Sequence, residues 1–250
     1  MIVIDIGNTN TVIGIYTNNK LIKINRISTK AIRLKKNLYP FFYKKIISKI
    51  KYDYKICIIS SVSLFSEKVL ISFFKSLEFK ILNININNIP KNIKFNYKLN
   101  QLGADRIANT FAAIKNYGNN SLVIDFGTAT TFDVVKNKIY EGGAIAPGIN
   151  ISHDALVNNA SKLNTVSIKA TNCIIGNDTK NSMQRGFYWS YINLINGNIN
   201  KIILEKRFRP KIILTGGLAK IFKKEIKYLT YYEPNLTLEG LYLIGLATYA

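Results

Sequence analysis

Two segments of this chain place an aspartate, a glycine and small polar residues in the same order. DIGNTNTVIG begins at Asp5 and DFGTATTFDVV begins at Asp125, half a chain later. A glycine permits a tight turn and lets a ligand approach the backbone closely. Successive backbone N–H groups in such a turn form an anion-binding concavity. The pattern therefore predicts two phosphate-binding turns.

The aspartate that begins each turn would repel a phosphate unless a cation lay between them. Mg²⁺ in proteins is held by one or two carboxylates together with phosphate oxygens and water. One D-x-G alone is more often an ordinary tight turn, so the pairing carries the prediction of a nucleotide clamp. The sequence G-x-x-x-x-G-K-[ST] does not occur, which disfavours the P-loop class.

A third glycine-bearing turn, Thr215-Gly216-Gly217, follows an apolar segment and precedes an expected helix. Free N–H groups at a helix start can bind a phosphate, and the paired glycines leave room for a flat ring. A simple strand-to-helix turn explains the same residues equally well.

A carboxylate and a guanidinium adjoin at Gly103-Ala104-Asp105-Arg106. Asp105 could cap the helix that begins here, because a carboxylate favours the positive end of a helix. It could also accept a proton from a substrate hydroxyl as a general base. Arg106 is more easily explained by an anionic ligand that it binds, bidentately if that ligand is a carboxylate. The residues alone leave both explanations of Asp105 open.

Strands and helices alternate along both halves of the chain, and the second half begins as the first does. Strands are expected over 1–6, 11–16, 21–27, 55–60, 79–83, 122–125, 130–135, 139–144 and 211–214. Helices are expected over 38–50, 62–77, 104–117, 152–163, 181–196, 217–228 and 237–248. This repetition predicts a duplicated α/β fold with domains over 1–117 and 118–250 and a ligand cleft between them.

Composition indicates a packed globular protein, since 48% of the residues are hydrophobic. No signal peptide and no transmembrane helix are expected, and the predicted location is the cytoplasm. The net charge of +21 could suit nucleic acid. The lysines are scattered among residues with AT-rich codons, so we attribute the charge to genome composition and do not expect a nucleic-acid partner. In either case a positive field attracts nucleotides.

Four single residues carry smaller expectations. Cys57 and Cys173 fit no metal spacing and are expected to be buried thiols in a reducing compartment. The single histidine, His153, is expected to be a surface or helix-start residue with no catalytic role. Trp189 is expected to pack in the core or at a dimer contact.

The quoted segments, with GADRIAN, GGAIAPGI and TGGLA in this order, resemble the type III pantothenate kinase family. The resemblance runs from Ile2 to about Thr248. That family belongs to the superfamily of acetate and sugar kinases, Hsp70 and actin. The resemblance implies duplicated actin-like (ribonuclease H-like) ATPase domains with an interdomain cleft.

The resemblance also implies an activity: transfer of the γ-phosphoryl group of ATP to the 4′-hydroxyl of pantothenate, toward coenzyme A, by a homodimer. Asp105 would be the general base, Asp5 would hold Mg²⁺ with the phosphates, and Asp125 would bind K⁺ or NH₄⁺. The expected ATP-binding residues are Asp5, Ile6, Gly7, Asn8, Thr9, Asn10, Thr11, Val12, Thr128, Gly216 and Gly217. The expected pantothenate-binding residues are Tyr97, Gly103, Ala104, Asp105, Arg106 and Thr179, the last of them reaching the partner subunit's substrate.

One departure and three alternatives accompany the resemblance. The family usually has a tyrosine and then a proline before its G-x-D-R, whereas Tyr97 lies one place closer here and no proline follows. The alternatives are a superfamily kinase for a sugar or acetate, a non-enzymatic regulatory or nucleic-acid-binding relative, and a decayed enzyme. The chain retains every carboxylate that the chemistry needs, which disfavours the decayed enzyme.

Overall fold

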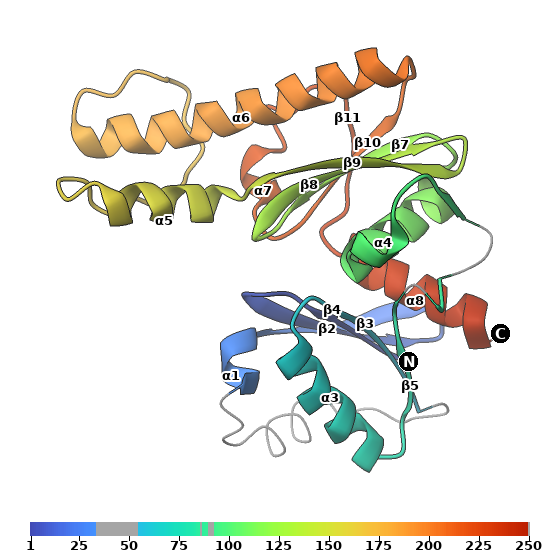
Figure 1. Ribbon diagram of the computed structural model, residues 1–250. Coiled ribbons are helices and arrows are strands. Elements are labelled where there is room, and N and C mark those ends of the chain that lie inside the picture. The colour runs from blue at the N-terminus through green and yellow to red at the C-terminus, as the bar shows by residue number, and fades with distance from the viewer. Residues whose placement is uncertain (34–54, 86, 90–92, 250) are drawn as a thin grey trace. The chain divides into compact units, whose positions relative to one another are not determined.

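A computed structural model describes residues 1–33, 55–85, 87–89 and 93–249 (Figure 1). The contacts between Cα atoms divide the chain into two compact units. Unit 1 comprises Met1–Ile93, Lys98–Ala112 and Leu236–Ala250, and unit 2 comprises Lys94–Tyr97 and Ala113–Asn235. The helix expected over 38–50 lies outside the described residues.

Unit 1 is built on a five-stranded sheet with the strand order β3-β2-β1-β4-β5. Its strands are β1 (Ile2–Ile6), β2 (Asn10–Thr17), β3 (Lys20–Ser28), β4 (Ile56–Ser61) and β5 (Lys80–Asn83). The first three form an antiparallel meander, while β4 runs parallel to β1 and β5 runs parallel to β4. Asn18 and Asn19 both have positive φ, as the tight hairpin turn between β2 and β3 requires.

Helices cover both faces of the unit 1 sheet (Figure 1). On one face, α3 (Leu64–Ser76) packs Leu70 and Phe74 against the isoleucines of β1 and β2. On the other face lie α4 (Ala104–Ala112) and α8 (Leu236–Tyr249), which pack against each other and against β4. Two shorter elements, α1 (Thr29–Arg33) and the 3₁₀ turn Leu99–Gln101, complete the described part of the unit.

Unit 2 repeats the architecture of unit 1. Its sheet has the order β11-β10-β7-β8-β9-β6. The strands are β6 (Lys94–Phe95), β7 (Ser121–Phe126), β8 (Ala129–Lys136), β9 (Ile139–Pro147), β10 (Lys211–Thr215) and β11 (Leu229–Tyr232). From β9 to β11, the neighbours and their directions match those from β3 to β5, with an antiparallel meander followed by two parallel strands. This match confirms the predicted duplication.

One face of the unit 2 sheet is covered by a long helix, α6 (Thr179–Lys206), which runs across it in Figure 1. Tyr188, Ile195 and Ile199 of α6 join the core of β7, β8 and β10. The short helix α7 (Ala219–Phe222) adds Phe222, which stacks on Phe126 with ring centroids 5.4 Å apart. Helix α5 (Ile149–Asn159) lies beside the first half of α6 (Figure 1).

Three expectations about the elements differ from the structure. The helix expected over 104–117 ends at Ala112 and continues as a π-helical turn, Ala113–Tyr117, so the two units meet in sequence inside that expected helix. The helix expected over 217–228 is only the short α7, and β11 follows it. Helix α8, which the 117/118 boundary would assign to the second domain, belongs to unit 1. It is apolar on most of its surface and has to be covered on several sides, by α4 and by β1.

Two further observations concern the rest of the chain. Cys57 is buried in β4 as predicted, but Cys173 is exposed, because it lies in the segment without helix or strand between α5 and α6. Trp189 packs against the unit 2 core, as one of the two predicted environments requires. Within the described residues, none of the helices combines the length and the hydropathy that a membrane crossing needs.

Candidate active site

The first D-x-G turn connects β1 to β2 and is closed by its own backbone. The Gly7 N–H donates to the Asn10 carbonyl at 3.0 Å, and a Cβ at Gly7 would lie 2.9 Å from that same oxygen. The turn therefore excludes a side chain at this position. The Thr29 hydroxyl donates to the Gly7 carbonyl at 2.8 Å and lies 3.0 Å from the Thr11 hydroxyl. These hydrogen bonds of Thr29 stabilise the turn.

The predicted ATP-binding residues of this turn differ in what they expose. Asn8, Thr9 and Asn10 are exposed, so an anion could approach this part of the turn. Ile6 points into the α3 core and Thr11 is buried against Thr29, so these two would contribute through the backbone alone. The exposed side chains of this turn are therefore two amides and a hydroxyl, all of them neutral.

Asp5 is the next-to-last residue of β1 and lies on the face of the unit 1 sheet that α4 and α8 cover. It pairs with Val12 of β2 and Ser60 of β4. Side chains alternate along a strand, so Asp5 shares its face with Val3, which borders Leu238 of α8 beside Gly14. Asp5 and the helix that begins with Ala104-Asp105 therefore belong to the same side of this sheet.

The second D-x-G turn connects β7 to β8 and is one residue shorter. Here the Gly127 N–H donates to the Ala129 carbonyl at 3.1 Å, whereas Gly7 reaches the third residue after it. The Gly148 N–H donates to the Thr128 carbonyl at 3.1 Å. A Cβ at Gly148 would lie 2.2 Å from that oxygen, so the P-G at the end of β9 packs directly on the turn. Sequence reasoning did not include Gly148 in the site, although it lies in the quoted GGAIAPGI.

The structure brings Asp125, Thr128 and Gly216 together in unit 2. Thr215, the last residue of β10, pairs with Asp125 of β7. Gly216 then adopts φ +92°, and a Cβ on it would lie 2.5 Å from Asp125 Oδ1 and 2.5 Å from the Phe126 nitrogen. Glycine is required there both by the φ angle and by the space. The Gly216-Gly217 turn that precedes α7 is therefore part of the second D-x-G site.

The G-A-D-R segment forms the start of α4 in unit 1. The Ile107 N–H donates to the Gly103 carbonyl at 3.1 Å, which makes Gly103 the residue at the head of the helix. Asp105 Oδ1 accepts the Arg106 N–H at 2.8 Å, so the carboxylate does interact with the first turn. A Cβ at Gly103 would lie 2.4 Å from Asp105 Oδ1. Arg106 is only 5% exposed.

Burial raises the pKa of the Asp105 carboxyl above its ordinary value. The Arg106 N–H and the Arg106 charge act in the opposite direction, but burial is the largest cause. Perturbed carboxyl groups are concentrated at catalytic sites, because a base with a raised pKa accepts a proton more readily. This shift fits the general-base explanation better than helix capping alone, since capping by itself lowers a carboxyl pKa.

A pocket of about 340 Å³ adjoins Gly103 and Ala104 within unit 1. Among the described residues, its lining contains no charged side chain, and its polar groups are the side chains of Ser61, Asn85 and Asn100 together with backbone. Sequence reasoning missed these three residues, which come from β4, from the segment after β5 and from the 3₁₀ turn Leu99–Gln101. Such a lining suits a neutral, amide- and hydroxyl-bearing ligand.

Two predicted pantothenate-binding residues lie in unit 2. Tyr97 follows β6 and packs its ring on β9. Thr179 is the first residue of α6 and is exposed. The preceding Asp178 caps that helix, with Oδ1 accepting the Asn181 N–H at 2.7 Å, and this bond lowers the Asp178 pKa.

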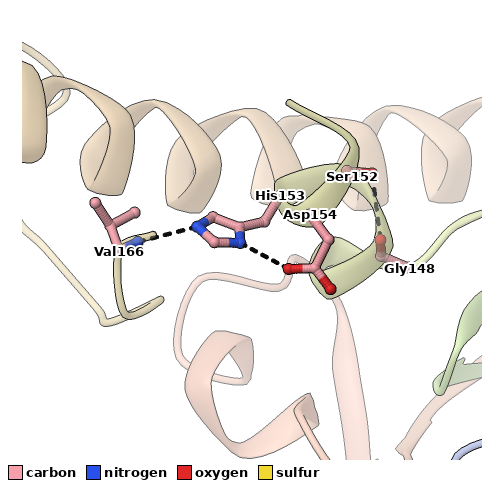
Figure 2. A network of polar contacts seen from close by, with 5 residues as sticks. All are labelled: Gly148, Ser152, His153, Asp154 and Val166. Atoms are coloured by element: carbon pink, nitrogen blue, oxygen red, sulfur yellow. Dashed lines mark hydrogen bonds and ion pairs between the residues drawn. The ribbon is translucent and has the colours of Figure 1, made fainter. Parts of the chain in front are cut away.

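The prediction that His153 lies at the surface is wrong. It is 4% exposed, in the middle of α5, and its ring connects two parts of unit 2 (Figure 2). Nε2 accepts the Val166 N–H at 3.0 Å, and Nδ1 lies 3.1 Å from Asp154 Oδ1. A backbone N–H can only donate, so Nε2 carries no proton and Nδ1–H donates to Asp154. His153 thereby anchors the segment between α5 and α6.

Known proteins resemble this chain over most of its length. The model of the family described as type III pantothenate kinase matches residues 1–201. A type III pantothenate kinase of Persephonella marina is 39% identical over 96% of this chain and 95% of its own. A type III pantothenate kinase of Pelagibacter ubique is also 39% identical, over 96% of each chain.

Solved structures support the fold. A Campylobacter jejuni protein described as a Baf family transcriptional activator has a TM-score of 0.62 at 20% identity, over 99% of this chain and 98% of its own. MreB 5 of Spiroplasma citri, bound to AMPPNP, has a TM-score of 0.52 at 13% identity, over 99% and 96%. These likenesses confirm the actin-like α/β fold. Since the family model spans residues 1–201, and with them both D-x-G turns and the G-A-D-R helix start, this chain belongs to the type III pantothenate kinase family.

Proposed function

We propose that this chain transfers the γ-phosphoryl group of ATP to the 4′-hydroxyl of pantothenate, giving ADP and 4′-phosphopantothenate, the first step toward coenzyme A. The family match carries the proposal, because it spans the two D-x-G turns and G-A-D-R together. We place the reaction in the cytoplasm, where ATP is made available to small-molecule kinases.

In this proposal Asp105 is the general base. It takes the proton of the 4′-hydroxyl while that oxygen bonds to the γ-phosphorus and the bond to the ADP oxygen breaks. Burial raises the pKa of Asp105, which suits this task. Arg106 binds the pantothenate carboxylate, and Gly103 and Ala104 border the neutral pocket that receives the rest of the substrate.

The nucleotide is assigned to both D-x-G turns. The exposed residues from Asn8 to Asn10 bind phosphate oxygens, and Thr128, Gly216 and Gly217 contact ATP from unit 2. Asp5 would hold Mg²⁺, which neutralises charge on the phosphates when bound. A single carboxylate beside a phosphate-binding turn suits this ion, because Mg²⁺ is usually held by one or two carboxylates together with phosphate oxygens and water.

Asp125 would bind the monovalent cation, K⁺ or NH₄⁺, beside the backbone of Gly216. Replacing Asp125 with asparagine removes the negative charge while keeping the shape. We expect the variant to lose most of the activation by K⁺, measured as the ratio of rates in K⁺ and Na⁺ buffers. Asp154→Asn, an exposed carboxylate of the same unit, is the matched control and should keep the wild-type ratio. Unchanged K⁺ activation in Asp125→Asn would remove the assignment.

We also propose a homodimer in which Thr179 reaches the partner's pantothenate. Two exposed isoleucines precede this residue in the chain, with Ile174 57% and Ile175 81% exposed. Ile151 and Leu156 of the adjoining α5 are exposed as well. Apolar side chains gathered at one end of a unit are typical of a surface that a second protein covers.

The decisive experiment is ATP consumption by the purified chain with Mg²⁺ and pantothenate, in K⁺ buffer and then in Na⁺ buffer. Pantothenate-dependent turnover that needs K⁺ is the expected result. Turnover with a sugar or acetate in place of pantothenate would favour another kinase of the superfamily. Salt-sensitive DNA binding without any turnover would favour a regulatory relative.

A further inference from the structure

A fully buried carboxylate lies in unit 2 outside the site described above. Asp133 of β8 is 0% exposed. The Tyr140 hydroxyl donates to its Oδ1 at 2.9 Å, and the Thr131 hydroxyl donates to its Oδ2 at 3.2 Å. Burying a carboxylate costs free energy unless hydrogen bonds compensate it. We therefore ask what the hydrogen bonds of Asp133 hold in place.

Tyr140 is held by Asp133 at one end and supports β6 at the other. It pairs with Phe95 in the parallel ladder between β9 and β6, and its carbonyl accepts the Asn96 N–H at 2.8 Å. It is itself 0% exposed. Strand β6 has only two residues, so this short ladder needs support from the side chains beneath it.

The support continues to Tyr97. The rings of Tyr97 and Tyr140 meet edge to face, with centroids 5.8 Å apart and an interplanar angle of 79°. The Tyr97 ring also lies next to Gly142, whose absent Cβ would be 3.5 Å from Cδ2. Tyr140 and Gly142 therefore form the surface on which the Tyr97 ring lies.

We propose that Asp133 is a positioning residue for substrate binding: by holding the Tyr140 hydroxyl it fixes the ring that supports Tyr97, and so fixes where Tyr97 meets the substrate. This inference rests on the proposed function, which assigns Tyr97 to pantothenate. Loss of the bond removes a contact that fixes the Tyr140 ring, and Tyr97 then packs against a less rigid surface. The effect falls on substrate affinity, because no reacting group is touched.

Tyr140→Phe is the first test, since it keeps the ring and removes the donor. We expect the KM for pantothenate to rise about fivefold to tenfold, while kcat and the KM for ATP stay within about twofold. Asp133→Asn should restore most of the affinity lost in Asp133→Ala, because the amide oxygen still accepts from Tyr140. Tyr191→Phe is the matched control: it removes another buried tyrosine hydroxyl of the same unit, one bonded to Thr130. Tyr191→Phe should lower the unfolding temperature without raising the KM for pantothenate relative to the KM for ATP.

A double-mutant cycle separates this inference from the proposed function. If Tyr97→Ala raises the KM for pantothenate, Tyr140→Phe should add nothing to it, because both act through one ring. Normal KM values in Tyr140→Phe alone would then overturn the inference. Normal KM values in Tyr97→Ala would instead remove Tyr97 from the proposed site.

A readout without turnover completes the test. Fluorotyrosine placed at position 97 reports its ring environment by ¹⁹F NMR in the full chain. We expect one resonance that shifts or broadens in Tyr140→Phe and stays unchanged in Tyr191→Phe. An identical resonance in Tyr140→Phe would overturn the proposal even if the chain phosphorylated no pantothenate.

Discussion

Replacing Asp105 with asparagine lowers kcat for pantothenate by about 10²–10⁴-fold, the usual contribution of a positioned general base. The asparagine can still accept the Arg106 N–H through its side-chain oxygen, so the start of α4 should persist. Binding of ATP, measured by calorimetry, should stay near that of the wild type, because the phosphate turns are untouched. A variant with near-normal kcat would disprove the general-base role.

The same substitution should leave stability almost unchanged. Burial raises the pKa of Asp105, so the folded chain holds this proton more tightly than the unfolded chain does. The free energy of unfolding therefore falls as the pH rises from the ordinary carboxyl pKa through the raised one, and the ionised group opposes folding above it. Asparagine removes the cost of burying an ionised carboxylate, but it also removes the attraction to Arg106. We therefore expect the free energy of unfolding to change by no more than about 1 kcal/mol at neutral pH.

The raised pKa also sets the acid limb of the pH profile. A base must be deprotonated to act, so kcat for pantothenate should fall on acidification at a higher pH than an ordinary aspartate would give. The comparison of kcat at several pH values in one buffer series with constant K⁺ measures this limb.

Gly240→Ala should produce the largest loss of stability among single methyl additions in the described helices. A Cβ at Gly240 would lie 2.0 Å from the Ala108 carbonyl oxygen and 2.5 Å from its carbon. Both atoms are backbone, so α8 and α4 would have to move apart. Overpacking usually lowers the free energy of unfolding by about 1–3 kcal/mol, and a backbone clash belongs at or above the upper end. Urea unfolding of the two proteins measures the difference.

Gly197→Ala is the matched control for that variant. Gly197 also lies inside a long helix, α6, but a Cβ there would meet nothing within 4 Å. Alanine favours a helix over glycine by about 1 kcal/mol, so this variant should be more stable than the wild type. Equal losses in both variants would mean that the close approach of α4 and α8 is not what matters at Gly240.

The parts of the fold that the sequence predicted are those in which local chemistry and periodicity agree. The D-x-G turns could be recognised in the sequence because glycine is required where the turn closes on one of its own carbonyl groups, as at Gly7. The alternation of strands and helices then predicted the duplication, since each half has a D-x-G turn between strands and so implies a sheet of the same kind. Asp125 and Gly216 were expected near ATP only from the family resemblance, and the structure then places their strands side by side.

The parts that the sequence did not predict depend on distant packing. Nothing local distinguishes the helical stretch before Ala112 from the π-helical turn after it, although the two belong to different units. His153 looked like a surface residue because its partner, the Val166 N–H, belongs to a loop without a pattern. Ser61, Asn85 and Asn100 line the pocket from separate segments, so no spacing could reveal them.

The assignment of α8 to unit 1 has a consequence for how the chain is made. The ribosome completes β1 long before α8, the helix that packs against it. Unit 2, by contrast, is fully synthesised at Asn235. During synthesis on the ribosome, we therefore expect unit 2 to fold before unit 1, because unit 1 still lacks α8. A chain truncated before Leu236 would then leave unit 1 incompletely folded, while unit 2 would still fold.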